Sequence, residues 1–131
     1  MTQEQKDILL KDLCARLPYG VRINVDAQGD FTLIGLTKES VFTACEIEGW
    51  HYNFPIEIIK PYLFPLSSMT SEQKKELNDK LIELELKALN DEISRIEAVK
   101  FEIDYYLKNQ LDYRGLITMD LAIDATGLNI Y

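Results

Sequence analysis

Hydrophobic positions near the start of the chain repeat with the period of an α-helix. Isoleucine and leucine recur from Ile8 to Leu17, with polar residues between them. Thr2 stands before this stripe and Gln5 follows three positions later, which is the order of residues in a capping box. Pro18 and Gly20 then interrupt the pattern. The sequence therefore predicts an amphipathic N-terminal helix of about four turns.

The period changes to two residues after Gly20, where apolar and polar side chains alternate as in a half-buried strand. The first such segment runs from Val21 to Val25, and further strand-like segments span residues 31–36, 41–48 and 50–54. The short connections leave no room for crossover helices, so neighbouring strands are expected to be antiparallel. We expect a three- or four-stranded antiparallel meander.

Pro55, Pro61 and Pro65 punctuate the next stretch, which is otherwise rich in apolar residues. Proline has no N–H to donate, so this stretch is predicted to be neither a central strand nor a long helix. We expect an extended linker that runs over the sheet and contains one helical turn from Glu57 to Ile59.

A long helical segment is predicted from Ser71 to Gln110, because neither glycine nor proline occurs between Leu66 and Arg114. Thr70 and Gln73 form a second capping-box pair at its start. Isoleucine and leucine recur at intervals of three and four residues, and the spacing keeps its phase across the middle of the segment. This helical seam comprises Ile82, Leu86, Leu89, Ile93, Ile96, Ile103 and Leu107.

Two arrangements fit the helical seam. A single continuous helix would be about 60 Å long at 1.5 Å per residue, and its exposed seam would pair with another subunit. Alternatively, the chain folds back at Asn90 and Asp91 into a helical hairpin. The retained phase favours the continuous helix, since a hairpin does not need to keep its register across the turn.

The stretch over residues 112–131 is mostly apolar, and Gly115 can take the left-handed conformation that ends many helices. An apolar tail of this kind is expected to dock on the protein, as a strand added to the sheet edge. The predicted fold class is α+β in a single domain. Its parts are a helix, meander and proline-rich linker over 1–69, the long helical segment over 70–111 and the docked tail over 112–131.

The chain of 131 residues carries a net charge of -8, from 14 basic and 22 acidic residues spread along its length. A negative field repels phosphate groups, which argues against direct nucleic-acid binding and against an anionic membrane surface. No stretch reaches the roughly 18 apolar residues that a membrane-spanning helix needs. The first residues lack the basic start and apolar run of a signal peptide, so a cytoplasmic location is expected, in a cell or in an infected host.

Residues with catalytic potential are few. Cys14 and Cys45 are expected to be reduced and buried, and the only histidine, His51, has too few companions for a zinc site. Glycine-rich nucleotide signatures and the serine hydrolase signature are absent. Aspartates near the C-terminus offer a candidate magnesium cluster, although a solvated acidic surface is the preferred interpretation. These aspartates are Asp104, Asp112, Asp120 and Asp124. We expect no catalytic residue, no cofactor and no bound metal.

Aromatic residues gather around the prolines, and most of them are expected in the core. Any that remain exposed would mark an interaction patch. The candidates for this aromatic patch are Trp50, Tyr52 and Tyr62.

Two segments carry a resemblance to known sequences. They read KPYLFPLSSMT at residues 60–70 and DYRGLI at residues 112–117, with LAI following at 121–123. Together they resemble a group of small uncharacterised proteins of Bacteroidales genomes, often encoded in prophages or mobile elements. The resemblance covers the chain from about residue 50 onward. It implies a phage-type setting and no catalytic residue.

Three functional hypotheses follow. The leading one is a non-enzymatic interaction or oligomerisation module, in which the helical segment pairs with itself or with another protein. The second is an inhibitor whose acidic surface occupies the basic, nucleic-acid-binding site of a host enzyme. The third is a metal-dependent hydrolase that uses the C-terminal aspartates.

Overall fold

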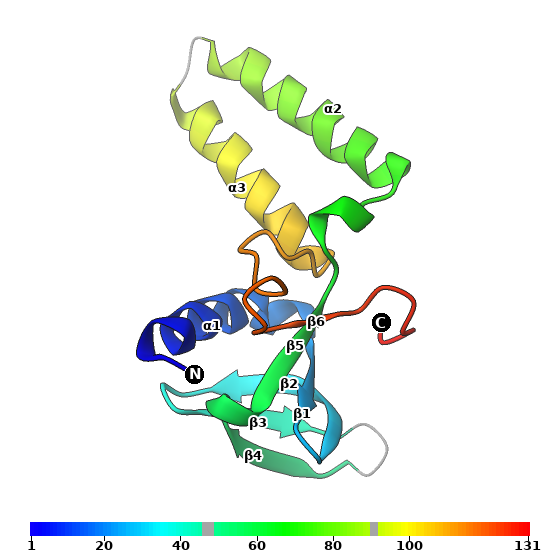
Figure 1. Cartoon of the computed structure of the whole chain (residues 1–131). Helices are drawn as coiled ribbons and strands as arrows, with labels where there is room; N and C mark the ends of the chain where they lie inside the picture. Colours follow the sequence, from blue (N-terminus) through cyan, green and yellow to red (C-terminus); the bar gives the residue numbers. More distant parts are fainter. Residues whose placement is uncertain (46–48, 90–91) are drawn as a thin grey trace.

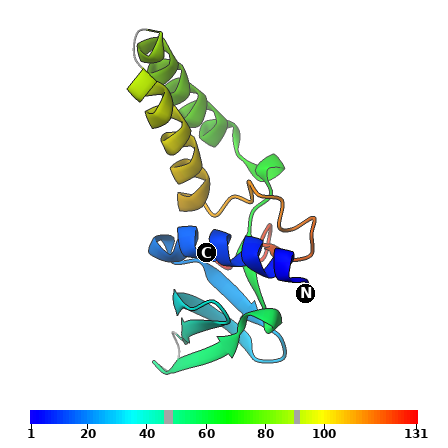
Figure 2. The same ribbon diagram turned by 90° about the vertical axis from the view of Figure 1, so that its left-hand side faces the viewer.

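A computed structural model of the protein describes residues 1–45, 49–89 and 92–131, without the side chains of 92–94. Within these residues the fold is α+β, as the sequence predicts, with an N-terminal helix, a six-stranded sheet and two further helices. Helix α1 (Gln3–Arg16) lies between the sheet and the base of the other two helices in both views (Figures 1 and 2).

The capping box predicted for α1 is present. The Thr2 hydroxyl oxygen accepts a hydrogen bond from the Gln5 N–H at 3.1 Å, and the Gln5 side chain accepts one from the Thr2 N–H at 3.0 Å. Leu9 and Leu13 are fully buried in the main core. Cys14 is exposed, so its predicted burial is wrong: it stands about 100° around the helix from Leu13, beyond the buried face.

The predicted antiparallel meander forms the larger part of the sheet, and the strand order is β4-β3-β2-β1-β5-β6. Its four strands are β1 (Arg22–Val25), β2 (Gly29–Leu36), β3 (Ser40–Ala44) and β4 (His51–Pro55). Alternate residues of β1 and β3 are buried, which is the pattern of a sheet with one face on the core. The sheet nevertheless has more strands than predicted, because two additional strands join beyond β1.

The proline-rich stretch is part of the sheet, so its prediction as a linker outside the sheet is wrong. Strand β5 (Ile59–Leu63) pairs antiparallel with β1, after a short helical turn η2 (Ile56–Ile58). The Asp26 N–H donates to the Ile58 carbonyl, which fixes the phase of the pairing between β5 and β1. From Ile58 onward, every second residue directs its backbone N–H and C=O groups towards β1. Pro61 is one of the residues whose backbone nitrogen points away from β1, so its lack of an N–H removes no hydrogen bond to β1. The nitrogen points towards the sheet edge, where β6 (Ile123–Asp124) pairs only with the two residues that follow Pro61.

The C-terminal tail docks on the body, mostly as turns rather than as the expected extended chain. Its two-residue strand β6 adds parallel to β5 at the sheet edge. The Tyr131 hydroxyl accepts a hydrogen bond from the Arg22 N–H at 3.0 Å and donates one to the Tyr62 carbonyl at 2.6 Å. This hydroxyl links β1 to β5 just beyond the residues that pair directly.

The long helical segment is a hairpin, so the favoured continuous helix is wrong and the alternative is the one observed. Helices α2 (Ser71–Ala88) and α3 (Glu92–Lys108) run antiparallel and pack against each other, away from the sheet (Figure 1). The Tyr105 hydroxyl lies 3.3 Å from the Gln73 carbonyl and 3.2 Å from a Glu76 carboxylate oxygen. Folding back buries apolar side chains that a lone helix would leave in water.

A buried ion pair joins α1 to the base of the hairpin. The side chains of Asp12 and Arg16 are fully buried, and the Arg16 Nε donates to the Asp12 carboxylate at 2.7 Å. The Arg16 Nη2 also donates to the Leu111 carbonyl at 2.6 Å, just after α3 ends. Because Arg16 and Leu111 lie far apart in the sequence, this contact orients the hairpin on the body.

Candidate functional site

The hairpin has an inner apolar face that is buried and an outer apolar face that is exposed. On the inner face, Leu77, Leu84 and Ala88 of α2 and Ala98 and Tyr105 of α3 are all buried. The outer face is here called the exposed stripe. Its members are Ile82 (55% exposed), Leu86 (64%), Leu89 (74%), Ile96 (58%), Val99 (57%) and Ile103 (37%).

The exposed stripe contains five of the seven residues of the predicted helical seam. Leu107, also in that seam, is buried near the base of α3 at 5% exposed, and the side chain of Ile93 is outside the described residues. Successive helical residues turn by about 100°, which places Ile82 and Leu86 on the far side of α2 from Leu77. Most of the helical seam, whose regular spacing favoured one long helix, therefore lies on the solvent-exposed surface of the hairpin.

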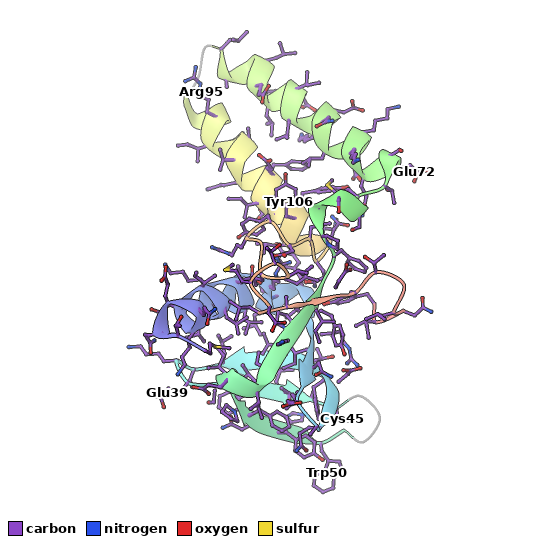
Figure 3. All side chains as sticks on the ribbon, in the orientation of Figure 1. Glu39, Cys45, Trp50, Glu72, Arg95 and Tyr106 are labelled. Atoms are coloured by element: carbon purple, nitrogen blue, oxygen red, sulfur yellow. The ribbon has the colours of Figure 1, made fainter. Side chains whose placement is uncertain are left out.

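A groove of about 400 Å³ lies between the two helices near the tip. Ala88 and Ala98 line it, and their small side chains leave room between the helices. Leu89 and Val99 line the same groove, so the two halves of the exposed stripe approach each other at these two residues, whereas the other four members point away from the neighbouring helix. Arg95, labelled near the tip in Figure 3, also lines the groove. The sequence did not predict this groove, although the two alanines, in helices made mostly of larger residues, are a signal for it.

Charged side chains of both signs surround the exposed stripe. Glu83 pairs with Lys80 at 3.5 Å and with Lys87 at 3.6 Å, and all three side chains are exposed. Exposed pairs of this kind add little stability to a monomer. An apolar centre with a mixed polar rim is typical of protein–protein interfaces, whereas a nucleic-acid site carries a concentrated positive charge.

The structure does not bring all three residues of the predicted aromatic patch together: Trp50 and Tyr52 are exposed, Tyr52 by 38%, whereas Tyr62 is buried. Trp50 is 65% exposed and projects from the end of the sheet opposite the hairpin (Figure 3). Tyr52 packs edge-on against Phe31, with ring centroids 5.7 Å apart. Tyr62 is buried on β5, and β3, β2 and β1 lie between it and β4. Burial, together with a hydrogen bond from its hydroxyl to the Asp30 carboxylate, raises the pKa of Tyr62.

Two of the other hollows on the described surface exceed 400 Å³, and a smaller one, of about 320 Å³, includes Asp26 and Glu57 in its lining. One of about 450 Å³ lies on the outer face of the sheet, lined by Ile34, Phe42 and His51 among others. The other, of about 420 Å³, lies where the hairpin meets the body and includes Tyr19 and Tyr131. The linings of the two larger hollows contain no aspartate or glutamate side chain, so neither of these two offers the pair of acidic groups used in many hydrolases.

The four aspartates considered for a metal site are engaged separately. Asp112 accepts hydrogen bonds from two backbone N–H groups of the tail, and Asp120 pairs with a lysine of β5 at 2.8 Å. The side chain of Thr126 and, to a smaller extent, its backbone N–H lower the pKa of Asp124 by hydrogen bonding to the carboxylate. Asp104 lies exposed on α3. Among the described residues, no group of three or more metal-ligating side chains is placed to hold an ion.

Comparison of the chain with family models, with curated proteins and with solved structures gives no match. None of the described helices combines the length and the apolar character needed to cross a membrane.

Proposed function

We propose that the protein is a non-enzymatic interaction module that self-associates through the exposed stripe of its helical hairpin. The observation that supports this proposal is the exposure of six aliphatic side chains, each more than a third exposed, on two adjacent helices. The hairpin extends away from the sheet (Figure 1), so a partner can reach it without displacing the body. Contiguous apolar surface on a folded protein marks an interaction site.

The free energy available from this surface is sufficient for association. The exposed fractions of the stripe are equivalent to about three and a half fully exposed side chains, each worth ~1.5–3 kcal/mol on burial. One stripe therefore contributes on the order of 5–10 kcal/mol, and a symmetric pair contributes twice that. Association itself costs about 4–15 kcal/mol. Mid-range values leave a surplus of about 5 kcal/mol, which corresponds to a dimer that forms at high micromolar protein concentration.

The spacing of the stripe residues indicates that the partner is a second copy of the chain. Ile82, Leu86 and Leu89 recur every four and three residues, and Ile96, Val99 and Ile103 recur every three and four. A helix with the same spacing can pack its side chains between them. Each copy presents one such run on α2 and one on α3, so a second copy can pack against either helix.

Sedimentation velocity on the full chain, from low to high micromolar concentration, tests the proposal. We expect the wild type to form a dimer as concentration rises. Leu86→Glu should weaken dimerisation by at least roughly 30-fold, because the side chain is buried in both copies and its loss removes about 2–4 kcal/mol. The substitution lies on an exposed position, so circular dichroism should show an unchanged fold.

The matched control is Ile34→Glu, which makes the same chemical change on the outer face of the sheet, where Ile34 is 45% exposed. We expect this variant to dimerise like the wild type. A wild type that stays monomeric at high micromolar concentration refutes the proposal. Equal effects of the two substitutions would also refute it, since dimerisation would then not depend on the stripe.

A further inference from the structure

We propose that the free edge of the sheet, strand β4, pairs with the same edge of a second copy of the chain. In this arrangement the two β4 strands run antiparallel, and Tyr52 of one copy lies opposite Tyr52 of the other on a two-fold axis. The edge and the hairpin lie at opposite ends of the molecule (Figure 1), so this contact is separate from self-association through the exposed stripe.

Strand β4 is an edge without the usual protection. It is the last strand in the sheet order, and within the described residues it pairs with β3 alone. The unpaired N–H and C=O groups of a free edge attract a further strand, and natural sheets usually prevent this with charged side chains. Strand β4 contains no aspartate, glutamate, lysine or arginine, and its one proline, Pro55, is its last residue. Most of this edge is therefore open to a further strand.

The hydrogen bonds to β3 determine which backbone groups of β4 face outward. The Cys45 N–H donates to the Trp50 carbonyl at 3.0 Å, just before β4 begins. In an antiparallel pair only every second residue directs its backbone groups towards the neighbouring strand. His51 and Asn53 are the intervening residues in the observed register, so their N–H and C=O groups point to the open edge.

A two-fold axis at Tyr52 makes full use of these outward groups. His51 of one copy then lies opposite Asn53 of the other, and the two residues exchange both of their backbone hydrogen bonds. Pro55, which has no N–H to donate, lies beyond these paired residues. The paired residues carry no carboxylate or ammonium group, so no like charges meet across the axis.

The same register brings aromatic side chains of the two copies together. Residues 50, 52 and 54 face the same side of the sheet, because side chains alternate along a strand. On this side the Tyr52 and Phe54 rings pack against Phe31, with centroids 5.7 and 5.1 Å away. Trp50 is 65% exposed and projects beyond the sheet (Figure 3). In the paired form it lies opposite Phe54 of the second copy, and cross-strand aromatic pairs of this kind stabilise a sheet.

A hollow of about 230 Å³ lies beside these rings. Its lining includes Phe31, Tyr52 and Phe54. Aromatic side chains reach diagonal as well as direct neighbours across a strand pair, so Trp50 of the second copy can enter this hollow from the edge. Its indole ring would then leave water for an aromatic environment, which favours the pairing.

The exposed area indicates that this contact is weak. Trp50 and Tyr52 are 65% and 38% exposed, which equals about one whole aromatic side chain, or roughly 150–250 Å². A stable interface buries about 800 Å² on each partner. We therefore expect the edges to pair only at about millimolar protein concentration.

The fluorescence of Trp50, the only tryptophan, tests the pairing. In the Leu86→Glu background, which removes the stripe contact, the emission should shift to shorter wavelength as the concentration rises to about 1 mM, because the indole leaves water. Asn53→Pro should abolish the shift, since it deletes an N–H that points away from β3, and circular dichroism should show an unchanged fold. Asn53→Ala is the matched control: it keeps this N–H and should shift like its parent.

Disulfide trapping tests the register. Directly opposite residues have Cβ atoms about 4.5–5.5 Å apart, close to the separation in a disulfide, so Tyr52→Cys should form an intermolecular disulfide under mild oxidation. Asn53→Cys lies opposite His51 of the second copy, so its own disulfide should form at least roughly tenfold more slowly. Both variants are made in a Cys14→Ser/Cys45→Ala background, and each rate is divided by that variant's rate of reaction with glutathione.

Three results would overturn this inference. The first is emission that does not shift up to about 1 mM. The second is an equal shift in Asn53→Pro and Asn53→Ala, since the pairing would then not use the outward N–H. The third is trapping of Asn53→Cys that is as fast as that of Tyr52→Cys, since the register would then be wrong. The proposed function is tested separately, by the effect of Leu86→Glu on sedimentation.

Discussion

The ion pair between α1 and the hairpin base yields the sharpest prediction about stability. Asp12→Ala removes a carboxylate that accepts hydrogen bonds from the Arg16 Nε at 2.7 Å and Nη2 at 3.3 Å, and that lies 3.3 Å from the Arg114 Nε. The Arg16 guanidinium would remain fully buried, with the Leu111 carbonyl and the Tyr113 ring as neighbours. Breaking one side of a buried pair typically costs about 3–5 kcal/mol.

Urea unfolding followed by circular dichroism measures this loss. With a denaturant slope of about 2 kcal/mol per molar for a small domain, the midpoint should fall by about 2 M. Asp7→Ala on the exposed side of the same helix is the matched control and should change the free energy of unfolding by less than about 0.5 kcal/mol. The double variant Asp12→Ala/Arg16→Met should recover most of the loss, because it no longer buries an unpaired charge.

A loss of less than about 1 kcal/mol in the free energy of unfolding of Asp12→Ala would refute this prediction, because leaving a buried guanidinium without its partner costs more than that. The prediction also fails if the double variant is no more stable than Asp12→Ala alone. Either result would mean that the guanidinium reaches water when its partner is removed.

Two further predictions concern tyrosines. Burial, together with a hydrogen bond to Glu102, raises the pKa of Tyr106 to about 12 from 10.0, so its contribution to stability is complete below pH 10 and is lost as pH rises from 10 to 12. Glu102→Gln should move this ionisation towards 10, as measured by tyrosinate absorbance, and an unchanged titration would count against the assignment. Tyr131→Phe removes the hydroxyl that links β1 to β5 and should cost about 1–2 kcal/mol in urea unfolding. Tyr19→Phe, for which no hydroxyl hydrogen bond is seen in the described residues, is the control and should be neutral.

Features that depend on neighbours in the chain could be predicted from the sequence. Both capping boxes form as expected, at Thr2 with Gln5 and at Thr70 with Gln73, because each needs only hydrogen bonds across three residues. The meander strands follow from alternating polarity and short turns, which are also local. Helical spacing likewise identifies five of the six members of the exposed stripe, all but Val99, although it also includes Leu107, which the fold buries.

Features that depend on contacts between distant segments were decided by the tertiary structure. Pro61 fits inside the sheet because its nitrogen points to an edge where β6 pairs only with the two residues that follow it. Nothing near Pro61 in the sequence specifies this direction. Leu77 and Tyr105 are brought together by the fold-back, although helical spacing is the same in a straight helix and in a hairpin. Which apolar face of α2 is buried depends on the free energy gained when α3 packs against it. The sequence by itself determined the helical spacing of the apolar residues, and the fold decided which of them are buried between α2 and α3 and which remain exposed.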